Sequence, residues 1–394
     1  MMNVYLDHNA TTPVHPEVLE KLPTWAEAWG NPSSVHQASR DPKALIRDTR
    51  KTLAEYLKVH PLELIFTAGG SESNNFAIKG SFYALQNLKE KSAGRTHYIT
   101  TTVEHPSVMK AFEFLESQGA TVDYIPVDKN ANLDLEFYKS KLTEKTALVS
   151  VMLANNETGA IHPIKEMCAL AHAKGAIFHM DAVQGLGKIE VDLTDLGVDL
   201  ASFSAHKFYS LKGCGVLFQK RGTQLIPLIG GGGQERGRRA GTENTLAIAA
   251  LGHMVSKKDL IAKENERIRK LRDDMEKEIL KSITNVRVIQ NPSRVPNTSS
   301  LFIEGVDGET LLMNLDMHGI CVSTGAACSS GSQEPSIVLR NMGFTRKEAQ
   351  SSLRISLGWL NNAEQIEYFL EVLKKVVIRI RQFNNTNSSQ SEAL

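Results

Sequence analysis

The chain has 394 residues, of which 41% are hydrophobic and 23% charged, and its 45 Lys and Arg nearly balance its 44 Asp and Glu. That length favours two or three domains, and the ordinary composition excludes a disordered, collagen-like or coiled-coil protein. A net charge of +1 gives no general attraction to nucleic acid or to an anionic membrane, so neither is expected as a direct partner.

The start of the chain and its cysteines indicate where the protein is located and which cysteine chemistry it can have. No segment approaches the roughly 18 consecutive apolar residues of a membrane-spanning helix. The first residues, MMNVYLDHNATTP, lack the basic and apolar regions of a signal peptide, so we expect a cytoplasmic protein. Cys168, Cys214, Cys321 and Cys328 form no CxxC pair, which argues against a zinc site or a disulfide framework. Any cysteine chemistry would then come from a single thiol.

Short apolar runs alternate with amphipathic segments from about residue 41 to residue 220, which is typical of βαβ units around a mostly parallel sheet. Asp41 is predicted to be the N-cap of a helix, with Pro42 at the first helical position. The predicted strands cover residues 64–67, 97–101, 120–127, 147–153, 176–180, 199–204 and 215–219.

Residues 243–283 contain no proline and carry apolar residues at helical spacing, which indicates one long helix or two in tandem. Strands near 286–289 and 300–304 and a final amphipathic helix follow. We therefore predict an α/β fold, in which a large domain with a mostly parallel seven-stranded sheet flanked by helices is joined to a smaller α+β domain. The expected divisions are an arm at 1–15 that packs with the small domain, a large domain at 16–260, a small domain at 261–383 and a disordered tail at 384–394.

Two polar side chains close neighbouring apolar strands of the large domain. Lys207 follows strand 199–204, and Asp181 follows strand 176–180. Ligands of open α/β sheets gather at the carboxyl ends of the strands, and a desolvated lysine amine can attack a carbonyl. Taken alone, Lys207 would be read as a surface charge and Asp181 as a cap or a salt-bridge partner.

Two further features reach the same edge of the sheet. Residues 69–75, GGSESNN, connect a strand to a helix, where backbone N–H groups and the helix dipole favour an anion. His105 opens the helix after strand 97–101, so its simplest role is a hydrogen bond at that helix start. Each feature is weak evidence by itself.

The second half of the chain offers a thiol and a guanidinium. Cys328 lies in STGAACSSGS (323–332), a run without large side chains that indicates a mobile loop rather than core, although a free cysteine is most often a small buried residue. Cys321 is predicted to be strand and core, and Cys168 and Cys214 are also interpreted as structural. Arg354 interrupts the apolar stretch LRISL (353–357). It is either a surface residue or a guanidinium that binds a carboxylate through two parallel hydrogen bonds.

A set of motifs spread from residue 5 to about residue 380 resembles the cysteine desulfurases of the NifS/IscS type, which belong to the class-V aminotransferase family. These motifs are YLDHNATTP (5–13), GNPSS.H (30–36), FT.G..ES (66–73), EHPSV (104–108), NNETG (155–159), DAVQ (181–184), SAHK (204–207), GRRAGTEN (237–244), ACSSGS (327–332) and LRISLG (353–358). The resemblance implies a fold-type I enzyme that uses pyridoxal 5′-phosphate, a cofactor that the strand ends alone do not identify.

The resemblance also implies the roles of individual residues. Lys207 would bond the cofactor aldehyde, Asp181 would pair with the pyridine nitrogen, and His105 would stack on the ring and act as a base. Gln184 and Asn156 would lie near the phenolic oxygen, Asn156 also near the substrate. The phosphate would be held by Gly70, Ser71, Ser204 and His206, and by Thr242 of a second copy of the chain, which implies a homodimer. Arg354 would bind the substrate carboxylate.

The implied reaction takes sulfur from L-cysteine and gives L-alanine and a persulfide on Cys328, for an iron-sulfur scaffold or another acceptor such as a tRNA-thiolation protein. No intrinsic metal is implied, although Cys328 could be a transient iron-sulfur ligand. One departure stands beside Lys207, where Ser210-Leu211 replaces the family's Gly-Pro. A selenocysteine lyase or aminotransferase of the same family remains an alternative. A non-catalytic iron-sulfur scaffold is another, which the lack of a cysteine cluster disfavours.

Overall fold

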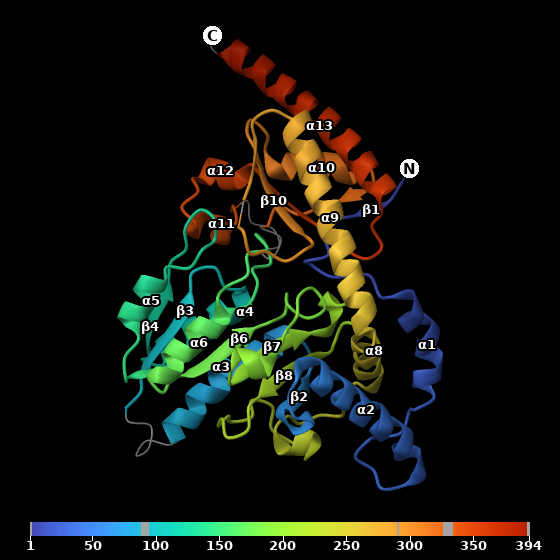
Figure 1. The fold of residues 1–394 in the computed structure, drawn as a ribbon, viewed down its shortest axis with the longest axis vertical. Helices are drawn as coiled ribbons and strands as arrows, with labels where there is room; N and C mark the ends of the chain where they lie inside the picture. Colours follow the sequence, from blue (N-terminus) through green and yellow to red (C-terminus); the bar gives the residue numbers. More distant parts are fainter. Residues whose placement is uncertain (1, 88–93, 290, 326–333, 392–394) are drawn as a thin grey trace.

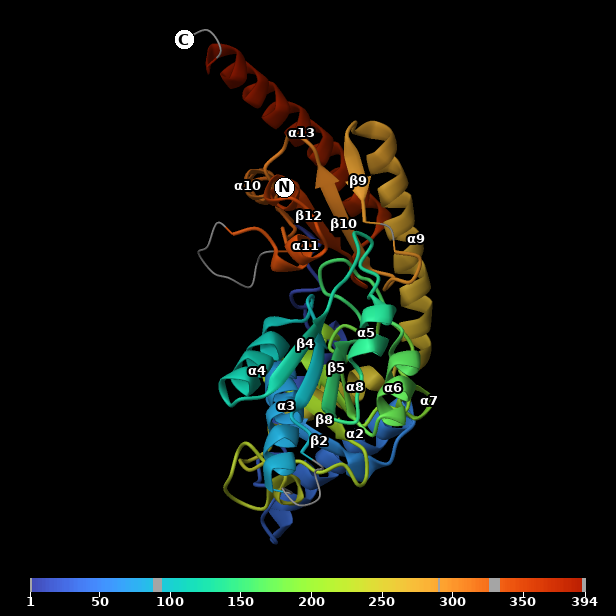
Figure 2. The ribbon, with the colours of Figure 1, turned by 90° about the vertical axis from the view of Figure 1, so that its left-hand side faces the viewer.

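The computed structural model of the chain describes residues 2–87, 94–289, 291–325 and 334–391. A large part is built around a seven-stranded sheet and a smaller part around a three-stranded sheet (Figure 1). Helix α9 (Lys258–Ser282) runs alongside both parts (Figure 2). The structure confirms the predicted fold class.

The large sheet has the strand order β2-β8-β7-β6-β5-β3-β4. Strand β8 runs antiparallel to both of its neighbours, β2 and β7, and every other neighbouring pair is parallel. Apart from the edge strand β4 (Thr121–Ile125), the strands are almost entirely buried because helices cover both faces of the sheet, and this explains why they appear as largely apolar runs in the sequence. Their bounds are Leu64–Thr67 (β2), His97–Thr101 (β3), Thr121–Ile125 (β4), Thr146–Met152 (β5), Ile177–Asp181 (β6), Leu200–Ser204 (β7) and Gly215–Gln219 (β8).

Helices α3 and α4 cover one face of this sheet, and α2, α5, α6 and α8 cover the other. Strand β5 shows the division, because Leu148 packs in the same apolar cluster as α3 and α4, whereas Val149 and Val151 pack in the cluster of the opposite face. The helices of the large part are Pro16–Ala26 (α1), Arg40–Leu57 (α2), Gly70–Asn87 (α3), Pro106–Ser117 (α4), Leu135–Lys141 (α5), Ile164–Ala173 (α6), Leu193–Leu196 (α7) and Thr245–Val255 (α8).

The structure differs from the sequence-based prediction at the start of one helix and decides between two alternatives for another stretch. The N-cap of helix α2 is Ser39 and not Asp41, and the helix starts at Arg40, because a 3₁₀ turn (Gln37–Ser39) runs directly into it. Pro42 still lies in the first turn, where a missing N–H costs nothing. The stretch 243–283 forms two helices, α8 and α9, so the tandem arrangement is the correct one of the two alternatives.

The smaller part combines an antiparallel sheet of order β12-β10-β9 with a short parallel pair, β1 and β11. Its strands are Val4–Tyr5 (β1), Val286–Val288 (β9), Thr298–Ile303 (β10), Ile320–Cys321 (β11) and Ser352–Ser356 (β12). Besides α9, its helices are Gly308–Asp316 (α10), Ile337–Asn341 (α11), Arg346–Gln350 (α12) and Ala363–Ser391 (α13). Because β1 pairs with β11, Val4 and Leu6 join the apolar core of this part.

Helix α13 continues to Ser391, and the disorder expected of the tail from residue 384 stays a prediction. The structure corrects one prediction in this region. Cys321 lies in a strand as expected but is exposed, not part of the core. Adjacent strand residues point to opposite sides, so the burial of Ile320 turns Cys321 outward.

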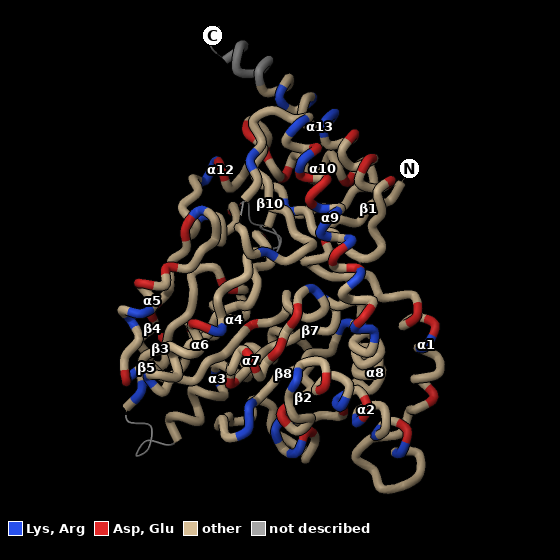
Figure 3. Tube along the Cα trace, in the orientation of Figure 1, with Lys and Arg blue, Asp and Glu red and all other residues tan. Residues whose placement is uncertain are grey.

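Charges of both signs are distributed over the molecule. Figure 3 shows blue and red segments interleaved along α9, in keeping with the net charge of +1. Within the part of the chain that the structure describes, no helix is long and apolar enough to cross a membrane.

Candidate active site

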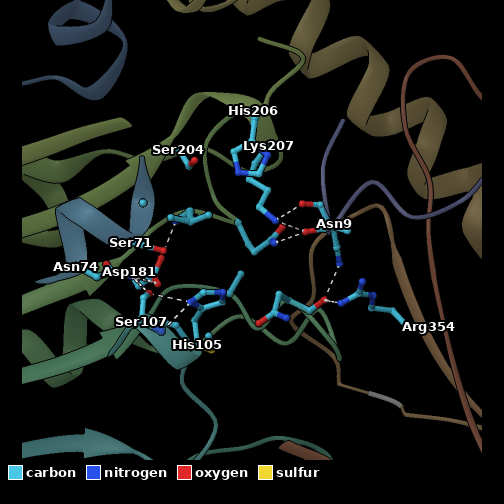
Figure 4. Close-up of a pocket in the computed structure, with 17 residues that line it drawn as sticks. Asn9, Ser71, Asn74, His105, Ser107, Asp181, Ser204, His206, Lys207 and Arg354 are labelled. Carbon is cyan, nitrogen blue, oxygen red and sulfur yellow. Dashed lines mark hydrogen bonds between the residues drawn. The ribbon is translucent and has the colours of Figure 1, made fainter. Parts of the chain in front are cut away.

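A cavity of about 270 Å³ opens at the carboxyl ends of β6 and β7, between the two parts of the molecule (Figure 4). Of the sequence-predicted site residues that the structure describes, all but Thr242 lie on it. The residues from this prediction that line the cavity are Gly70, Ser71, His105, Asn156, Asp181, Gln184, Ser204, His206, Lys207 and Arg354.

Secondary structure explains how these residues meet. Asp181 ends β6, and Lys207 ends the 3₁₀ turn Ala205–Lys207 that follows β7. His105 is the N-cap of α4 and follows β3, while Ser71 lies in the first turn of α3 after β2. Parallel strands that end at one edge therefore deliver residues far apart in the sequence to one cavity.

Lys207 points its amine across the cavity to the N-terminal arm. The Nζ atom donates to the backbone oxygens of Asn9 at 2.6 Å and Ala10 at 2.5 Å (Figure 4). The side chain is half-buried, so its amine lies in a region with reduced access to water.

Asp181 is a buried carboxylate with its two oxygens held by different donors. Oδ1 accepts from the backbone N–H of Val183 at 3.0 Å, and Oδ2 accepts from Nδ2 of Asn74 at 2.7 Å. These hydrogen bonds fix the plane of the carboxylate.

His105 has one ring nitrogen engaged by its own helix. Nδ1 lies 3.1 Å from the backbone nitrogen of Ser107, which donates to it, and 2.8 Å from the hydroxyl of Ser107. Burial lowers the pKa of His105, and the charge of Lys207 lowers it further, while Asp181 acts in the opposite direction. The ring is therefore neutral at physiological pH.

The N-terminus of α3 forms one wall of the cavity and packs closely against its neighbours at Gly70. A Cβ atom at Gly70 would lie 2.7 Å from Cγ2 of Val183, so a larger residue would force the wall apart. Ser71, Ser204 and His206 line the same region. Burial, with the nearby charges of Lys207 and Lys212, lowers the pKa of His206 to about 4. This corner therefore offers hydroxyl, imidazole and helix N–H groups to a ligand.

Arg354 comes to the cavity from the smaller part, on β12. Its Nη2 donates to Oδ1 of Asp7 at 2.7 Å, and Nη1 donates to the backbone oxygen of Asn156 at 3.2 Å. Nε is buried without a hydrogen-bond partner among the described residues. A buried donor without a partner is costly, and an acceptor on a ligand would satisfy it.

Asn9 joins the site residues to one another, although sequence analysis assigned it no role. Its backbone oxygen accepts from Lys207 and, at 3.0 Å, from Nε2 of Gln184. Its side-chain Nδ2 donates to the backbone oxygen of Asn156 and to Oγ1 of Thr298 on β10. The only signal in the sequence was its position inside the motif YLDHNATTP.

Lys188 lies behind Gln184 and Asn9 as a second, buried lysine. Its Nζ donates to Oδ1 of Asn9 at 2.8 Å and to Oε1 of Gln184. Burial places its pKa well below the ordinary lysine value, and the charges of Lys207 and Arg354 act in the same direction. Because a lysine amine donates to both amide oxygens, the NH₂ groups of Asn9 and Gln184 face the other way.

The turn after Lys207 departs from the family pattern and is held by packing. Tyr209 has φ 53°, in the left-handed region that a residue with a side chain seldom adopts. Its ring stacks on Trp359 with the ring centres 4.5 Å apart, and its hydroxyl accepts from the backbone N–H of Trp359 at 2.8 Å. These contacts hold Tyr209, the residue before Ser210-Leu211, in this conformation.

Two predicted site residues, Thr242 and Cys328, are not among the described residues that line the cavity. Thr242 is exposed, and its expected role requires a second copy of the chain. Cys328 lies outside the described residues, within 326–333. Among the described residues, no group of three or more His, Cys, Asp and Glu side chains could hold a metal ion.

Comparison with known proteins defines the class of this protein. A model of the class-V aminotransferase family matches residues 4–369. The cysteine desulfurase IscS of Clostridium botulinum is 44% identical over 387 residues, which cover 97% of this chain and 96% of that protein.

Solved structures agree with these sequence matches. A NifS-like protein superposes with a TM-score of 0.88 at 34% identity, covering 95% of this chain and 99% of the other. SspA, solved in complex with cysteine, superposes with a TM-score of 0.78 at 31% identity, covering 90% of this chain and 98% of the other. The chain belongs to the class-V aminotransferase family, among the cysteine desulfurases of the IscS/NifS type. Enzymes of this family depend on pyridoxal 5′-phosphate.

Proposed function

We propose that this chain binds pyridoxal 5′-phosphate through Lys207 and takes sulfur from L-cysteine, giving L-alanine and a persulfide on Cys328. The observation that carries the proposal is the meeting of Lys207, Asp181, His105 and Arg354 around one cavity. These residues offer an amine, a carboxylate, an imidazole and a guanidinium, which are the groups that such a cofactor and an amino acid need.

The cavity residues fit the chemical groups of the cofactor. Lys207 would hold the aldehyde and Asp181 the ring nitrogen, and Gln184 has an amide to offer to the phenolic oxygen. At the other end, the phosphate would meet the N-terminus of α3, where the small Gly70 permits close approach and Ser71, Ser204 and His206 add donors. When bound, the cofactor supplies an electron sink for the substrate carbon that bears the amino group.

Arg354 would select an amino acid by its carboxylate. Its guanidinium is held by Asp7 and the backbone of Asn156, while Nε keeps a donor without a partner. A guanidinium offers two parallel N–H groups to a carboxylate, which fixes the direction of the substrate as well as binding it.

The sulfur step is assigned to Cys328. Its thiolate would form an S–S bond with the substrate sulfur while the substrate C–S bond breaks, so that L-cysteine and the enzyme thiol become L-alanine and an enzyme persulfide. The three other cysteines are poor candidates. Burial raises the pKa of Cys168 and of Cys214 to about 12, and Cys321 lies on β11 at the outer side of the smaller part.

The remaining parts of the proposal concern the setting of the reaction. We expect a cytoplasmic homodimer in which Thr242 of the second copy completes the phosphate site. The exposure of Thr242 on this chain is consistent with that arrangement. We further expect the persulfide sulfur to pass to an iron-sulfur scaffold or to another sulfur-acceptor protein.

Product analysis tests this function with a matched pair of variants. Purified protein incubated with L-cysteine and a thiol reductant should release alanine and sulfide in equal amounts. Cys328→Ala should lose more than about 100-fold of this activity and keep the bound-cofactor absorbance. Cys321→Ala, which removes the exposed thiol on β11, should keep the activity. Full activity in Cys328→Ala, or alanine without sulfide, would refute the proposal.

A further inference from the structure

An ion pair joins the first turn of α3 to the segment that carries Thr242. Nε and Nη2 of Arg239 donate to the two carboxylate oxygens of Glu72, at 2.9 and 3.1 Å. The two side chains are only 19% and 18% exposed, so the pair is not a loose surface contact. A planar guanidinium bound at two points fixes direction as well as distance, and it ties Arg239 to α3 in one orientation. This pair has no part in the function proposed above.

Glu72 belongs to the turn that forms the phosphate corner of the cavity. It lies in the first turn of α3, directly after Gly70 and Ser71, which line the cavity. Its Oε2 also accepts from the backbone N–H of Ala68 at 2.8 Å, so the carboxylate holds the chain where it leaves β2 and enters the helix. A carboxylate in the first turn of a helix is stabilised by the helix dipole. Glu72 is therefore a fixed anchor for Arg239.

Arg239 in turn supports the backbone directly before Thr242. A Cβ atom at Gly241 would lie 3.2 Å from Nη1 of Arg239, so the guanidinium lies directly against Gly241. The φ of Gly241 is 101°, which favours glycine, and its N–H donates to Oε1 of Gln234 at 3.2 Å. Thr242 is the next residue and is exposed. The backbone that presents Thr242 is thus held by Arg239 and Gln234.

We propose that Glu72 and Arg239 are positioning residues that hold Thr242 for the cavity of a second copy of the chain. The inference deepens the proposed function and rests on it, because it needs pyridoxal 5′-phosphate in the cavity and Thr242 at the phosphate of the other copy. The strength with which one cavity holds the phosphate then depends on an ion pair in the other copy. This assigns a role to the second arginine of the motif GRRAGTEN (237–244).

A role within its own cavity is the competing explanation for this ion pair. In that case Arg239 would only offset the negative charge of Glu72 near the phosphate corner of the same chain. The two explanations differ in which copy of the dimer is affected when the pair is broken. They also differ in sign, because an effect of charge alone is opposite for loss of the cation and loss of the anion, whereas loss of positioning is the same for both.

Mixed dimers of full-length chains separate these explanations. One copy carries Lys207→Ala, which removes the amine that bonds the cofactor, so the absorbance of bound cofactor reports only the intact cavity of the other copy. Thr242 in that intact cavity comes from the Lys207→Ala copy. Arg239→Met or Glu72→Gln is then introduced into either copy, and two different affinity tags isolate the mixed dimer.

Titration with pyridoxal 5′-phosphate measures the affinity of the intact cavity. Arg239→Met in the Lys207→Ala copy should weaken binding about 10-fold, because the hydrogen bond of Thr242 to a charged group is lost. Glu72→Gln in the same copy should also weaken binding, since it removes the anchor of Arg239. Either substitution in the copy with the intact cavity should have a smaller effect. Pyridoxal, which lacks the phosphate, should bind equally well in all of these dimers.

The matched control is Arg269→Met, which breaks an exposed pair with Glu266 on α9 and should leave the affinity unchanged. If Arg239→Met does not fold, Arg239→Lys keeps the charge without the planar guanidinium and should weaken binding in the same arrangement. Unchanged affinity in every arrangement, a loss confined to the copy with the intact cavity, or a monomeric protein would overturn the inference while cofactor binding and alanine production stand. An unmodified protein that binds no cofactor would refute the proposed function and this inference together.

Discussion

Glu104, next to His105 in the sequence, is a buried carboxyl group close to the cavity. Its Oε1 accepts from the backbone N–H of Met152 at 2.9 Å and from the hydroxyl of Thr101 at 2.8 Å, while Oε2 has no partner among the described residues. Burial raises the pKa of Glu104 to about 8, and the charge of Asp181 contributes to the increase. The group is therefore protonated at neutral pH.

This pKa shift predicts how stability depends on pH. Between the ordinary carboxyl pKa of 4.5 and the folded value of about 8, the folded protein holds one proton more than the unfolded chain. The free energy of unfolding should therefore fall as pH rises through this window, with a contribution from Glu104 of up to about 1.4 kcal/mol per pH unit. Glu104→Gln should remove that contribution.

Urea unfolding at several pH values between these limits measures the effect. Glu104→Gln should gain stability relative to the unmodified protein as the pH increases, because the amide never needs to ionise. Exposed Glu136→Gln serves as the control and should follow the unmodified protein. An unmodified protein and a Glu104→Gln variant with the same pH dependence would show that Glu104 is ionised in the folded state.

Sequence reasoning pointed to cavity residues that carry a reactive or charged group, and it missed residues that only connect others. Lys207, Asp181 and His105 follow strands and carry recognisable groups, and the motifs assigned the rest of the cavity wall. Asn9 could not be found in this way, because its contact with Gln184 spans 175 positions and depends on the complete fold. Asn74 and Ser107 were missed since neither side chain suggests its partner.

At the scale of elements, a buried ion pair fastens the turn Gln234–Gly237 to α2 and β2. Arg50 donates to both carboxylate oxygens of Glu235, at 2.9 and 2.6 Å, and to the backbone oxygen of Leu64 at 2.6 Å. Glu235 also accepts from the backbone N–H of Phe66 at 3.1 Å. Its φ of 45° is unfavourable for a residue with a side chain, so these contacts offset the strain.

Removing one partner of this pair should destabilise the fold strongly. Arg50→Met leaves the buried carboxylate of Glu235 without its cation, which costs about 3–5 kcal/mol of unfolding free energy. The double variant Arg50→Met with Glu235→Gln should recover most of the loss, because it removes the unpaired charge. Chemical denaturation measures the free energy of unfolding of each variant from the midpoint and the slope of its transition.

A second arginine on the same helix supplies the control. Arg47 forms an exposed pair with Asp48, and Arg47→Met should leave the denaturation midpoint unchanged. If Arg50→Met behaves like Arg47→Met, the buried pair does not hold the turn.

The elements themselves were largely predictable. The seven strands of the large sheet appear within two residues of their predicted positions, because strands buried on both faces must be apolar throughout. Helix ends were harder, since they depend on local turns such as the one before α2. The helical tail of α13 shows that a polar composition alone does not end a helix.

At the scale of the whole molecule, the candidate site exists only because three distant stretches meet. The large part supplies Lys207 and Asp181, the smaller part supplies Arg354, and the N-terminal arm passes between them with Asp7 and Asn9. The arm also pairs with the smaller part through β1 and β11. A change in how the two parts pack would therefore alter the distance between the amine and the guanidinium.

The central claim is that Lys207, and not its buried neighbour Lys188, carries the cofactor. Borohydride reduction of the purified protein, trypsin digestion and mass spectrometry test it most directly. We predict one pyridoxyl adduct, on the peptide 189–212, in which the modified Lys207 resists cleavage. An adduct on Lys188 in the peptide 175–207, or no adduct in a protein that produces alanine and sulfide, would contradict it.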